Sequence, residues 1–518
     1  MSLQRLLAPL VALFLSAPLA AQHDRPEYLK IEARDREAVE AIDRLHLVDI
    51  DRYRPDEGAV YVYARPGSAA ELARRGFRVE QLPDPGINPD PGPDLALTAP
   101  LGLWDSFPSW SGYVTMMQGY ADANPLIARL IWLGATTNTV RPHALWAMKL
   151  SDRPDDEEDE PEVFLTSTMH GDETTGYMLL LRLIDELTAH YAPGSVDPYD
   201  QRITRLLDHV EIWILPNSNP DGTYYQQDSS VSGAIRYFTW PSGASAWIDP
   251  NRNFPDPEDG AHPDGEAYWA ETEQMMSFAA ARSIALSLNY HGGAEVVNYP
   301  WDTWSHVHPD TDWFVDWATA WAVSAQAAGA AAGLGSSYMT DLFGASTIPG
   351  VTNGYDWYEV NGGRQDFMTW EQRGREVTIE VSQTKNPAGS QMPLYWDANR
   401  EALLAFVEVA LGGVRGIVTD SHGTPLAAEI AIPARDLDHS ETWTDPDVGD
   451  YHRMLEPGTF ALRFSAPGYE PLDVAGVAVA AGDATRRDVV LLHPGEEPPL
   501  FADNFETAST ARWTATGD

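Results

Sequence analysis

Residues 162–181 read EVFLTSTMHGDETTGYMLLL, and this stretch decides the fold. Residues 162–169 form an apolar run of strand length, and an apolar run of helical length begins at residue 176. His170 and Glu173 therefore lie on the turn between a strand and a helix. Open α/β sheets bind their ligands at such places, outside the carboxyl ends of the strands. The stretch predicts an α/β sheet with a polar site at this turn.

Two later stretches bring more polar side chains to strand ends. Residues 284–290 are an apolar run that leads directly into His291, and residues 376–380 form a strand that ends in Glu380. Two imidazoles and one carboxylate are typical ligands of a catalytic zinc, whose fourth position is left to water. We therefore predict one Zn²⁺ bound by His170, Glu173 and His291, with Glu380 as general base and acid.

A plainer interpretation is a buried histidine beside two solvated acids. A single His-x-x-Glu pattern is weak evidence, but three strand ends that converge on one crevice are harder to dismiss. The matching stretches are HGDE at 170–173, DPNRNFPD at 249–256, YHGG at 290–293 continuing to NYPWD at 298–302, GGRQD at 362–366 and TIEV at 378–381. In this order they resemble the zinc carboxypeptidases, and within them the regulatory-type branch that includes carboxypeptidases D, E, M and N. The resemblance spans roughly residues 99–411.

The resemblance implies further roles in substrate binding. Asn251 and Arg252 match the pair that binds the terminal carboxylate of the substrate, and Tyr358 matches the tyrosine that closes over it. A planar guanidinium can bind a carboxylate through two parallel hydrogen bonds, which lysine cannot do. Asp249 matches an acid that orients a zinc-bound imidazole. Arg236 is the candidate for the arginine that stabilises the oxyanion. Taken singly, a surface arginine and an ordinary aromatic would explain Arg252 and Tyr358.

The resemblance also implies a specificity. Asp302 matches an acid in the pocket for the C-terminal side chain, and Gln365 matches a polar residue in the same pocket. A buried carboxylate without a protein cation is costly unless a ligand brings the charge. We therefore expect a preference for C-terminal Arg or Lys. The alternative is an Asp302 that is hydrogen-bonded within its own loop beside Thr303.

Other functions remain open at this point. A related zinc amidohydrolase that acts on cell-wall peptides could share the metal ligands, and a carboxypeptidase could have a non-basic specificity. A non-catalytic zinc-binding protein would be expected to lack the base at Glu380. A serine hydrolase is disfavoured because the chain has no Gly-x-Ser-x-Gly.

Composition excludes several classes of partner. The chain has 518 residues, a formal charge of −43 and no cysteine. Such a charge disfavours binding to nucleic acid or to an anionic membrane, and zinc cannot be bound by thiolates. Peptide or protein C-termini are the expected partners, and we expect a monomer. The acidic run at residues 155–160 is interpreted as a solvated loop rather than a calcium site.

The amino terminus has the pattern of an export signal. Arg5 precedes an apolar run at residues 6–15, and small residues follow at Ala17, Ala20 and Ala21. The run is too short to span a membrane. We expect residues 1–21 to be a signal peptide and the protein to be secreted or periplasmic.

Three folded units are expected after the signal. Residues 22–82 alternate like strands at 28–33, 46–51, 59–64 and 77–82, with helical spacing at 36–45 and 68–75. This β-α-β-β-α-β order is a split βαβ domain, with either an inhibitory or folding-assisting role, as in pro-segments, or a plain accessory role. A Pro-rich linker follows at residues 83–98.

The remaining units are the catalytic domain and a smaller β domain. Residues 99–411 should form a mixed, mostly parallel sheet flanked by helices, as the resemblance implies. Residues 412–493 contain short alternating runs between turn signals, which predict a β-sandwich resembling the transthyretin-like domain of the regulatory-type carboxypeptidases. Residues 494–518 form an acidic tail without an assigned role.

Overall fold

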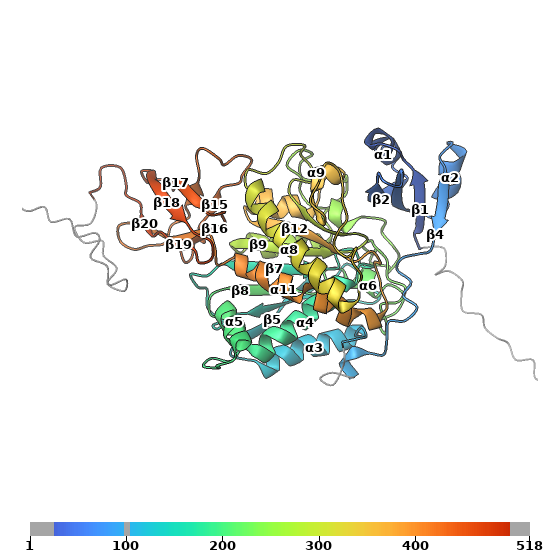
Figure 1. Ribbon diagram of the computed structural model, residues 1–518, viewed down its shortest axis with the longest axis horizontal. Helices are drawn as coiled ribbons and strands as arrows, with labels where there is room; N and C mark the ends of the chain where they lie inside the picture. The colour runs from blue at the N-terminus through green and yellow to red at the C-terminus, as the bar shows by residue number, and fades with distance from the viewer. Residues whose placement is uncertain (1–24, 98–103, 498–518) are drawn as a thin grey trace, which may run out of the picture.

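The computed structural model describes residues 25–97 and 104–497. Figure 1 shows three units in a row, with the N-terminal domain at one end, the large α/β domain in the middle and the small β domain at the other end. The expected signal peptide and most of the acidic tail lie outside the described residues. In the described part of the chain, we find no helix that combines the length and apolar character needed to cross a bilayer.

The N-terminal domain is the split βαβ sandwich that its alternating pattern predicted. Its elements are β1 Glu27–Glu32, α1 Arg36–Asp43, β2 Val48–Arg54, β3 Ala59–Ala64, α2 Ser68–Arg74 and β4 Val79–Leu82. The strands form one antiparallel sheet in the order β2-β3-β1-β4. Asp35 caps α1 by accepting a hydrogen bond of 2.9 Å from the Ala38 amide, which explains where this helix begins.

The central domain is built on one mixed sheet of eight strands. They are β5 Ala128–Ala135, β6 Ala144–Leu150, β7 Glu162–Ser167, β8 Glu211–Leu215, β9 Ile284–His291, β10 Glu295–Tyr299, β11 Val351–Asn353 and β12 Arg375–Val381. Their order is β11-β10-β12-β9-β7-β8-β6-β5, with β12, β9, β7 and β8 parallel to one another. The expected fold class, a mixed α/β sheet flanked by helices, is therefore confirmed.

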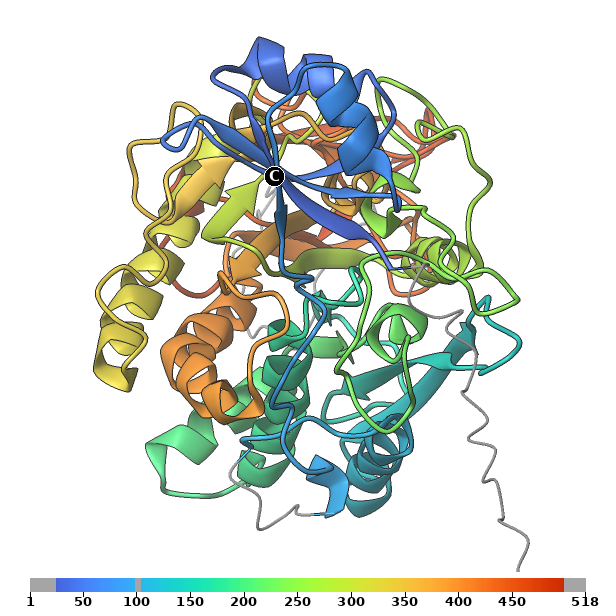
Figure 2. The ribbon, with the colours of Figure 1, turned by 90° about the vertical axis from the view of Figure 1, so that its right-hand side faces the viewer.

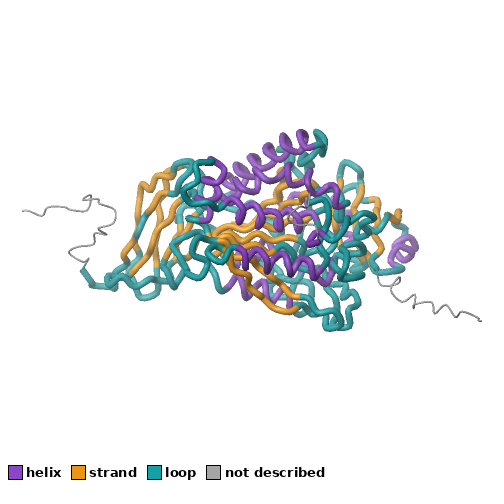
Figure 3. The backbone as a smooth tube through the Cα atoms, turned by 90° about the horizontal axis from the view of Figure 1, so that it is seen from below, coloured by secondary structure: helices purple, strands orange, loops and turns teal. Residues whose placement is uncertain are grey.

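Helices cover both faces of this sheet. The longer ones are α3 Trp110–Ala123, α4 Thr175–His190, α5 Pro198–Leu207, α7 Ala270–Ala280, α8 Thr311–Ala332 and α11 Met392–Val409. Short helical turns make up the rest: η2 Leu95–Leu97, α6 Pro220–Thr223, η3 Pro250–Arg252, α9 Gly354–Trp357, α10 Arg364–Asp366, η4 Phe367–Glu371 and η5 Gly389–Gln391. Helices α3, α4, α5, α8 and α11 share the larger apolar core, while α7 packs in a separate core on the other face. Figures 2 and 3 show the helices and loops that enclose the strands.

Strand register explains how distant residues come together. In the parallel pair β9–β12, the Cα atom of Glu380 lies opposite that of His291. In the adjoining pair β7–β9, Ser167 lies opposite Tyr290. The chain leaves β7 three residues before His170. The carboxyl ends of β7, β9 and β12 thus deliver His170, His291 and Glu380 to one edge of the sheet.

The C-terminal domain is a two-sheet β-sandwich, as expected. Its strands are β13 Val414–Thr419, β14 Glu429–Ala431, β15 Thr442–Trp443, β16 Asp450–Arg453, β17 Gly458–Ser465, β18 Leu472–Val479, β19 Thr485–Arg486 and β20 Val489–Val490. One sheet combines β13, β16, β19 and β20, and the other runs β15-β14-β17-β18. A separate apolar core, which includes Val414, Ile430 and Phe464, fills the space between them.

A buried ion cluster joins this sandwich to the central domain. Asp310, just before α8, pairs with Arg375 at 2.6 Å, with Arg435 at 2.8 Å and with Arg453 at 2.5 Å. Burial alone raises the pKa of the Asp310 carboxyl, but the charges of Arg453 and Arg375 outweigh it and hold that pKa well below its usual range. Arg435 and Arg453 come from the C-terminal domain, so the cluster holds the two domains together.

The Pro-rich segment after β4 is more tightly packed than a free linker. Asn88 is buried and donates from Nδ2 to the Pro387 carbonyl oxygen at 2.6 Å. Leu95 belongs to the larger apolar core of the central domain. Because these side chains contact the central domain, our candidates for a hinge or cleavage point are the residues before Asn88, around 82–85, where the end of β4 joins the linker.

We predict that Asp310→Asn will strongly destabilise the protein. The substitution removes the negative charge that compensates two buried guanidinium groups, Arg375 and Arg453, and a partly buried one, Arg435. Breaking a buried ion pair in this way costs about 3–5 kcal/mol. The measurement is chemical denaturation at neutral pH. Asp473→Asn, which breaks the exposed Arg463–Asp473 pair, should change stability little. Equal effects of the two substitutions would contradict the structural role of Asp310.

Candidate active site

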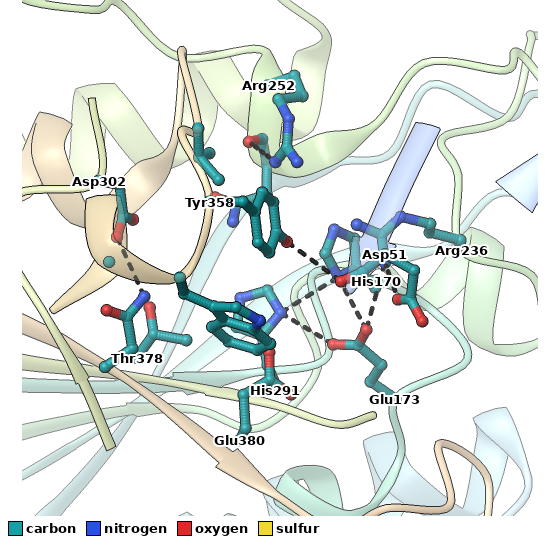
Figure 4. A pocket seen from close by; sticks show the side chains of 15 residues that line it. Asp51, His170, Glu173, Arg236, Arg252, His291, Asp302, Tyr358, Thr378 and Glu380 are labelled. Atoms are coloured by element: carbon teal, nitrogen blue, oxygen red, sulfur yellow. Dashed lines mark hydrogen bonds and ion pairs between the residues drawn. The ribbon is translucent and has the colours of Figure 1, made fainter. Parts of the chain in front are cut away.

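A small polar cavity lies at the carboxyl ends of β7, β9 and β12. Its volume is about 30 Å³, room for roughly two water molecules. Figure 4 shows its side chains, which come from all parts of the central domain and from β2 of the N-terminal domain. The lining residues are Asp51, His170, Glu173, Arg236, Asn251, Arg252, His291, Asn298, Asp302, Gly354, Trp357, Tyr358, Val360, Thr378 and Glu380.

The three predicted metal ligands lie together at the base of this cavity. His170 Nδ1 lies 3.0 Å from Glu173 Oε1, and His291 Nδ1 lies 2.9 Å from Glu173 Oε2. The two Nδ1 atoms are 3.1 Å apart. All three side chains are buried and place one ligand atom each within 4.8 Å of the others. Two imidazole nitrogens and a carboxylate that face one another suit a shared cation, and this donor set matches zinc.

Each imidazole has a second partner that fixes its orientation. His170 Nε2 lies 2.9 Å from Asp249 Oδ1, and His291 Nε2 lies 2.8 Å from the Asn289 amide. Outer partners of this kind orient metal-bound histidines. Asp249 therefore lies where the resemblance implied. Burial lowers the pKa of His291 to about 4, so this imidazole is neutral and has a free lone pair at neutral pH.

Glu380 lies beside the ligand group. Burial and then the charge of Glu173 raise the pKa of Glu380 well above its usual range. Its Oε2 atom is buried without a hydrogen-bond partner. A buried carboxyl group with a free oxygen, placed beside the ligand group, can accept a proton and return it.

Two cations face the ligand carboxylate. Lys385 Nζ lies 2.5 Å from Glu173 Oε1, and Arg236 Nη1 lies 3.4 Å from the same oxygen. Burial raises the pKa of Glu173, but the charges of His170 and Lys385 outweigh it and leave that pKa well below its usual range. Arg236 also pairs with Asp249 at 2.9 Å. The arginine expected from the resemblance is therefore in the cavity and close to the ligands.

The residues expected to bind a terminal carboxylate line another wall. Arg252 donates from Nη1 to the Asn251 carbonyl oxygen at 2.8 Å, and the Asn251 side chain accepts from the Arg364 amide at 2.9 Å. Burial raises the pKa of the Tyr358 hydroxyl to about 12, so it stays protonated. Figure 4 shows Tyr358 between Arg252 and the two histidines.

Asp302 lies at the far end of the cavity, away from the ligand group. Its Oδ1 accepts from Gln365 Nε2 at 2.9 Å and from Asn298 Nδ2 at 3.0 Å. Its bonds are thus to two neutral amides rather than to Thr303, the partner in the alternative interpretation. Burial raises the pKa of Asp302 to about 6. Glu295, a further acid on β10, does not line the cavity.

The N-terminal domain supplies Asp51 to this cavity. Asp51 Oδ1 lies 2.7 Å from Lys385 Nζ and 3.3 Å from Arg236 Nη1. Tyr358 donates to the Asp51 carbonyl oxygen at 3.1 Å. The register of β2 against β3 shifts between Ile50 and Arg52, so Asp51 is the extra residue of a β-bulge. Bulges redirect side chains in this way.

Sequence reasoning missed Asp51 and Lys385. Lys385 carries a weak signal, because the chain has three lysines and this one follows Glu380 by five residues. Asp51 carries none, because its place depends on a bulge and on how two domains pack. All the other predicted site residues are brought to one region, and Gln365 reaches it through Asp302.

The fold and the cavity together define a class of protein. It is an α/β protein whose strand ends present a group suited to one metal ion, with a raised-pKa acid beside it. The chain belongs to the zinc carboxypeptidase family, whose sequence pattern matches residues 113–402. A carboxypeptidase regulatory-like domain matches residues 413–492. The resemblance stated from the sequence is therefore confirmed, and members of this family are peptide hydrolases.

Individual relatives agree with this assignment. The chain is 31% identical over 411 residues to the carboxypeptidase N catalytic chain of Rattus norvegicus, covering 72% of this chain and 85% of that one. It is 32% identical over 369 residues to carboxypeptidase D of Homo sapiens, covering 68% of this chain but 26% of that one. The chain therefore spans about a quarter of carboxypeptidase D and most of the carboxypeptidase N catalytic chain.

Solved structures support the fold. Carboxypeptidase A from Helicoverpa armigera superposes with a TM-score of 0.53 at 14% identity, covering 74% of this chain and 98% of that chain. Thrombin activatable fibrinolysis inhibitor superposes with a TM-score of 0.52 at 14% identity, with the same two coverages of 74% and 98%. At these identities the likeness concerns the fold alone.

Proposed function

We propose that this chain is an exported zinc carboxypeptidase that removes C-terminal Arg or Lys from peptides. One observation carries the proposal: the ligand group, Glu380, Arg252 and Asp302 all line one cavity. A metal group alone would suit many hydrolases. A C-terminal basic residue fits this cavity better, because Arg252 can pair with its terminal carboxylate and Asp302 with its side chain. The metal ligands and Glu380 supply the groups needed for hydrolysis.

His170, Glu173 and His291 would hold one Zn²⁺. Zinc bound there supplies Lewis acidity toward a carbonyl group and toward water. The remaining chemistry belongs to the protein. Glu380 accepts a proton from the attacking water and returns it to the leaving amine, and its raised pKa makes it a stronger base for the first of these steps. No covalent intermediate with the protein is needed.

Arg236 is the proposed oxyanion donor. Its guanidinium is buried and held by Asp249, so it is positioned before a substrate arrives. Positioned donors of this type contribute roughly 3–4 kcal/mol each to catalysis. In the present arrangement Asp51 occupies part of its hydrogen-bonding capacity. Its full use in catalysis would therefore require Asp51 to leave.

Arg252, Asn251 and Tyr358 are the proposed binding group for the substrate's terminal carboxylate. A buried guanidinium with one bond to a backbone oxygen retains donors for a bidentate carboxylate contact. The tyrosine hydroxyl can donate once it is freed from the Asp51 carbonyl oxygen. These contacts would make the enzyme an exopeptidase.

Asp302 is the proposed specificity residue. Its carboxyl is buried and has only amide donors, so a substrate guanidinium or ammonium would supply the missing positive charge. An apolar side chain would leave this acid desolvated and without a cation. Gln365 holds the Asp302 carboxylate in place through its hydrogen bond to Oδ1.

We also propose that the N-terminal domain blocks the site until the chain is cut near residues 82–85. The Asp51 carboxylate pairs with Arg236 and Lys385, so it competes with substrate groups for these two cations. Further hydrogen bonds hold the domain against the central domain, among them Tyr237 to Asp49 and Tyr63 to Asp172, both at 2.5 Å, and Arg52 to the Gly293 carbonyl oxygen. The small cavity leaves no room for a peptide. The export signal at residues 1–21 would place this activation outside the cytosol.

We predict that chelation will abolish activity and that added zinc will restore it. Glu380→Gln should bind zinc as the parent does yet lose nearly all turnover, because it cannot accept the water proton.

Peptides with an amidated C-terminus should be poor substrates, since they lack the anion that Arg252 binds. The measurements are zinc content and peptide hydrolysis by the cleaved protein. Full activity without metal, or equal hydrolysis of acids and amides, would contradict the proposal.

The second prediction concerns specificity. Asp302→Ala should lower kcat/KM for peptides ending in Arg by a factor that corresponds to about 2–5 kcal/mol of lost transition-state stabilisation. The kcat/KM for peptides ending in Phe should change little. Glu295→Ala, which removes an acid outside the cavity, should leave the Arg preference unchanged. Because Asp302 has a pKa of about 6, it is charged above that pH and neutral below it. The Arg-to-Phe ratio should therefore fall as the pH drops through 6. A parent preference for Phe would contradict this role.

The third prediction concerns the N-terminal domain. The intact protein should hydrolyse small peptides slowly, and a cut placed within residues 82–85 followed by separation of the domain should raise the rate. Asp51→Asn should raise the activity of the intact protein, because it weakens the contacts to Lys385 and Arg236. Glu57→Gln, in a solvent-facing ion pair of the same domain, serves as the control. Equal rates before and after separation would contradict the blocking role. The same comparison can use a chain that starts near Leu101, a residue outside the described part of the structure.

A further inference from the structure

The acidic loop between β6 and β7 is less solvated than its sequence suggests. Glu158 is 8% exposed, and a carboxylate oxygen from each of Asp152, Glu158 and Glu160 lies within 4.8 Å of the others. The interpretation of residues 155–160 as a solvated loop is therefore wrong for its second half. Three acids have been brought together at the edge of the central domain.

Each of these three acids has an oxygen without a partner. Asp152 Oδ1, Glu158 Oε2 and Glu160 Oε2 are shielded from solvent, and none accepts a hydrogen bond. Buried polar atoms are nearly always satisfied, so three unsatisfied oxygens in one place need an explanation. Burial, then the charges of Asp152 and Glu211, raise the pKa of Glu160 to about 8.

Nearby acidic groups differ because they already have a protein cation. Glu211, in one neighbouring group, pairs with Lys149 at 2.7 Å. Asp159, in another, pairs with Arg486 at 2.5 Å. In the Asp152 group only Glu158 has such a partner, Arg153, whose side chain is 63% exposed and contacts the other oxygen of Glu158. The group therefore has three acidic side chains and one ion-pair partner, and a carboxylate oxygen of each acid lies within 4.8 Å of the others.

We propose that Asp152, Glu158 and Glu160 bind a calcium ion. Three carboxylates are hard oxygen ligands, and each can bind through one or two oxygens, as Ca²⁺ coordination allows. Asp152 and Glu160 are partly exposed, which leaves access for water to complete the shell. Zinc would prefer nitrogen or sulfur ligands, and magnesium demands a stricter octahedron. This site is separate from the catalytic cavity and uses none of its residues.

The position of the loop gives calcium a structural consequence. The loop is anchored at its start, where the Asp152 amide donates to the Leu207 carbonyl oxygen at 2.7 Å. Asp159, between two proposed ligands, accepts from Arg486 through its side chain and from Arg415 through its backbone oxygen at 3.3 Å. Both arginines belong to the C-terminal domain. An ion that fixes Glu158 and Glu160 therefore also fixes the residue that holds this domain.

The test uses the full chain, stripped of metal and reloaded with zinc. Titration with CaCl₂, followed by calorimetry, should show one calcium ion per chain, and calcium should raise the thermal unfolding temperature. Glu160→Gln and Asp152→Asn should each weaken calcium binding about tenfold or more, since each removes a charged ligand. Asp156→Asn, which removes an exposed acid of the same loop that is not in the group, should bind calcium as the parent does.

A folding defect can be distinguished from a lost ligand. In calcium-free buffer at neutral pH Glu160→Gln should be about as stable as the parent, because a pKa of about 8 already leaves the Glu160 carboxyl mostly uncharged there. Two outcomes would overturn the proposal: no binding or thermal shift up to about 10 mM calcium, well above the range of extracellular sites, or binding that survives both ligand substitutions unchanged. Neither readout depends on peptidase activity.

Discussion

Asp310 is surrounded by Arg375, Arg435 and Arg453, and this arrangement illustrates the constraint that governs the whole molecule. A carboxylate removed from water is unfavourable by several kcal/mol unless a cation lies beside it. The chain carries 77 acidic and 34 basic residues, so cations are in short supply. A buried acid in this chain therefore either lies beside one of these few cations, as Asp310 does, or accepts hydrogen bonds from neutral donors, as Glu271 does from Thr137, or is a candidate to bind a charge carried by a ligand.

The catalytic cavity follows the same constraint in three ways. Glu173 faces two imidazoles, with which it can share a metal ion, and a lysine and an arginine, which help to keep it ionised. Asp302 has amide donors but no ion pair with a protein cation, which leaves room for a charge carried by the substrate. Asp51 of the N-terminal domain forms ion pairs with Lys385 and Arg236. Removal of the N-terminal domain would therefore return two cations to the site at once.

Much of the fold and the metal group could be predicted from the sequence. His170 follows a short apolar strand, and His291 and Glu380 lie at the ends of two others, so their convergence depends on local pattern and on the parallel packing of strands. The strands and helices of the N-terminal domain were predictable for the same reason, since alternation and helical spacing are local properties. Asp302 could be placed in the pocket only through the resemblance to a family.

What could not be predicted depends on contacts between distant segments. Asp51 reaches the cavity because a bulge in β2 redirects it and because two domains pack together. The acidic loop looked solvated because a run of charges carries no information about which members are covered by other segments. Asn88 and Leu95 lie in a Pro-rich stretch that resembles a free linker, yet their side chains contact the central domain.

The N-terminal domain is also held by contacts that a cut in the chain leaves intact. Arg25, before β1, donates to the carbonyl oxygens of Gly233 at 2.6 Å and Ala234 at 2.9 Å. One cleavage near residue 83 would therefore turn an intramolecular contact into a bimolecular one without itself expelling the domain. A short tether provides an effective concentration in the millimolar range, which disappears once the tether is broken. Dilution after export would then determine when the domain departs, so activity should depend on the volume into which the protein is released.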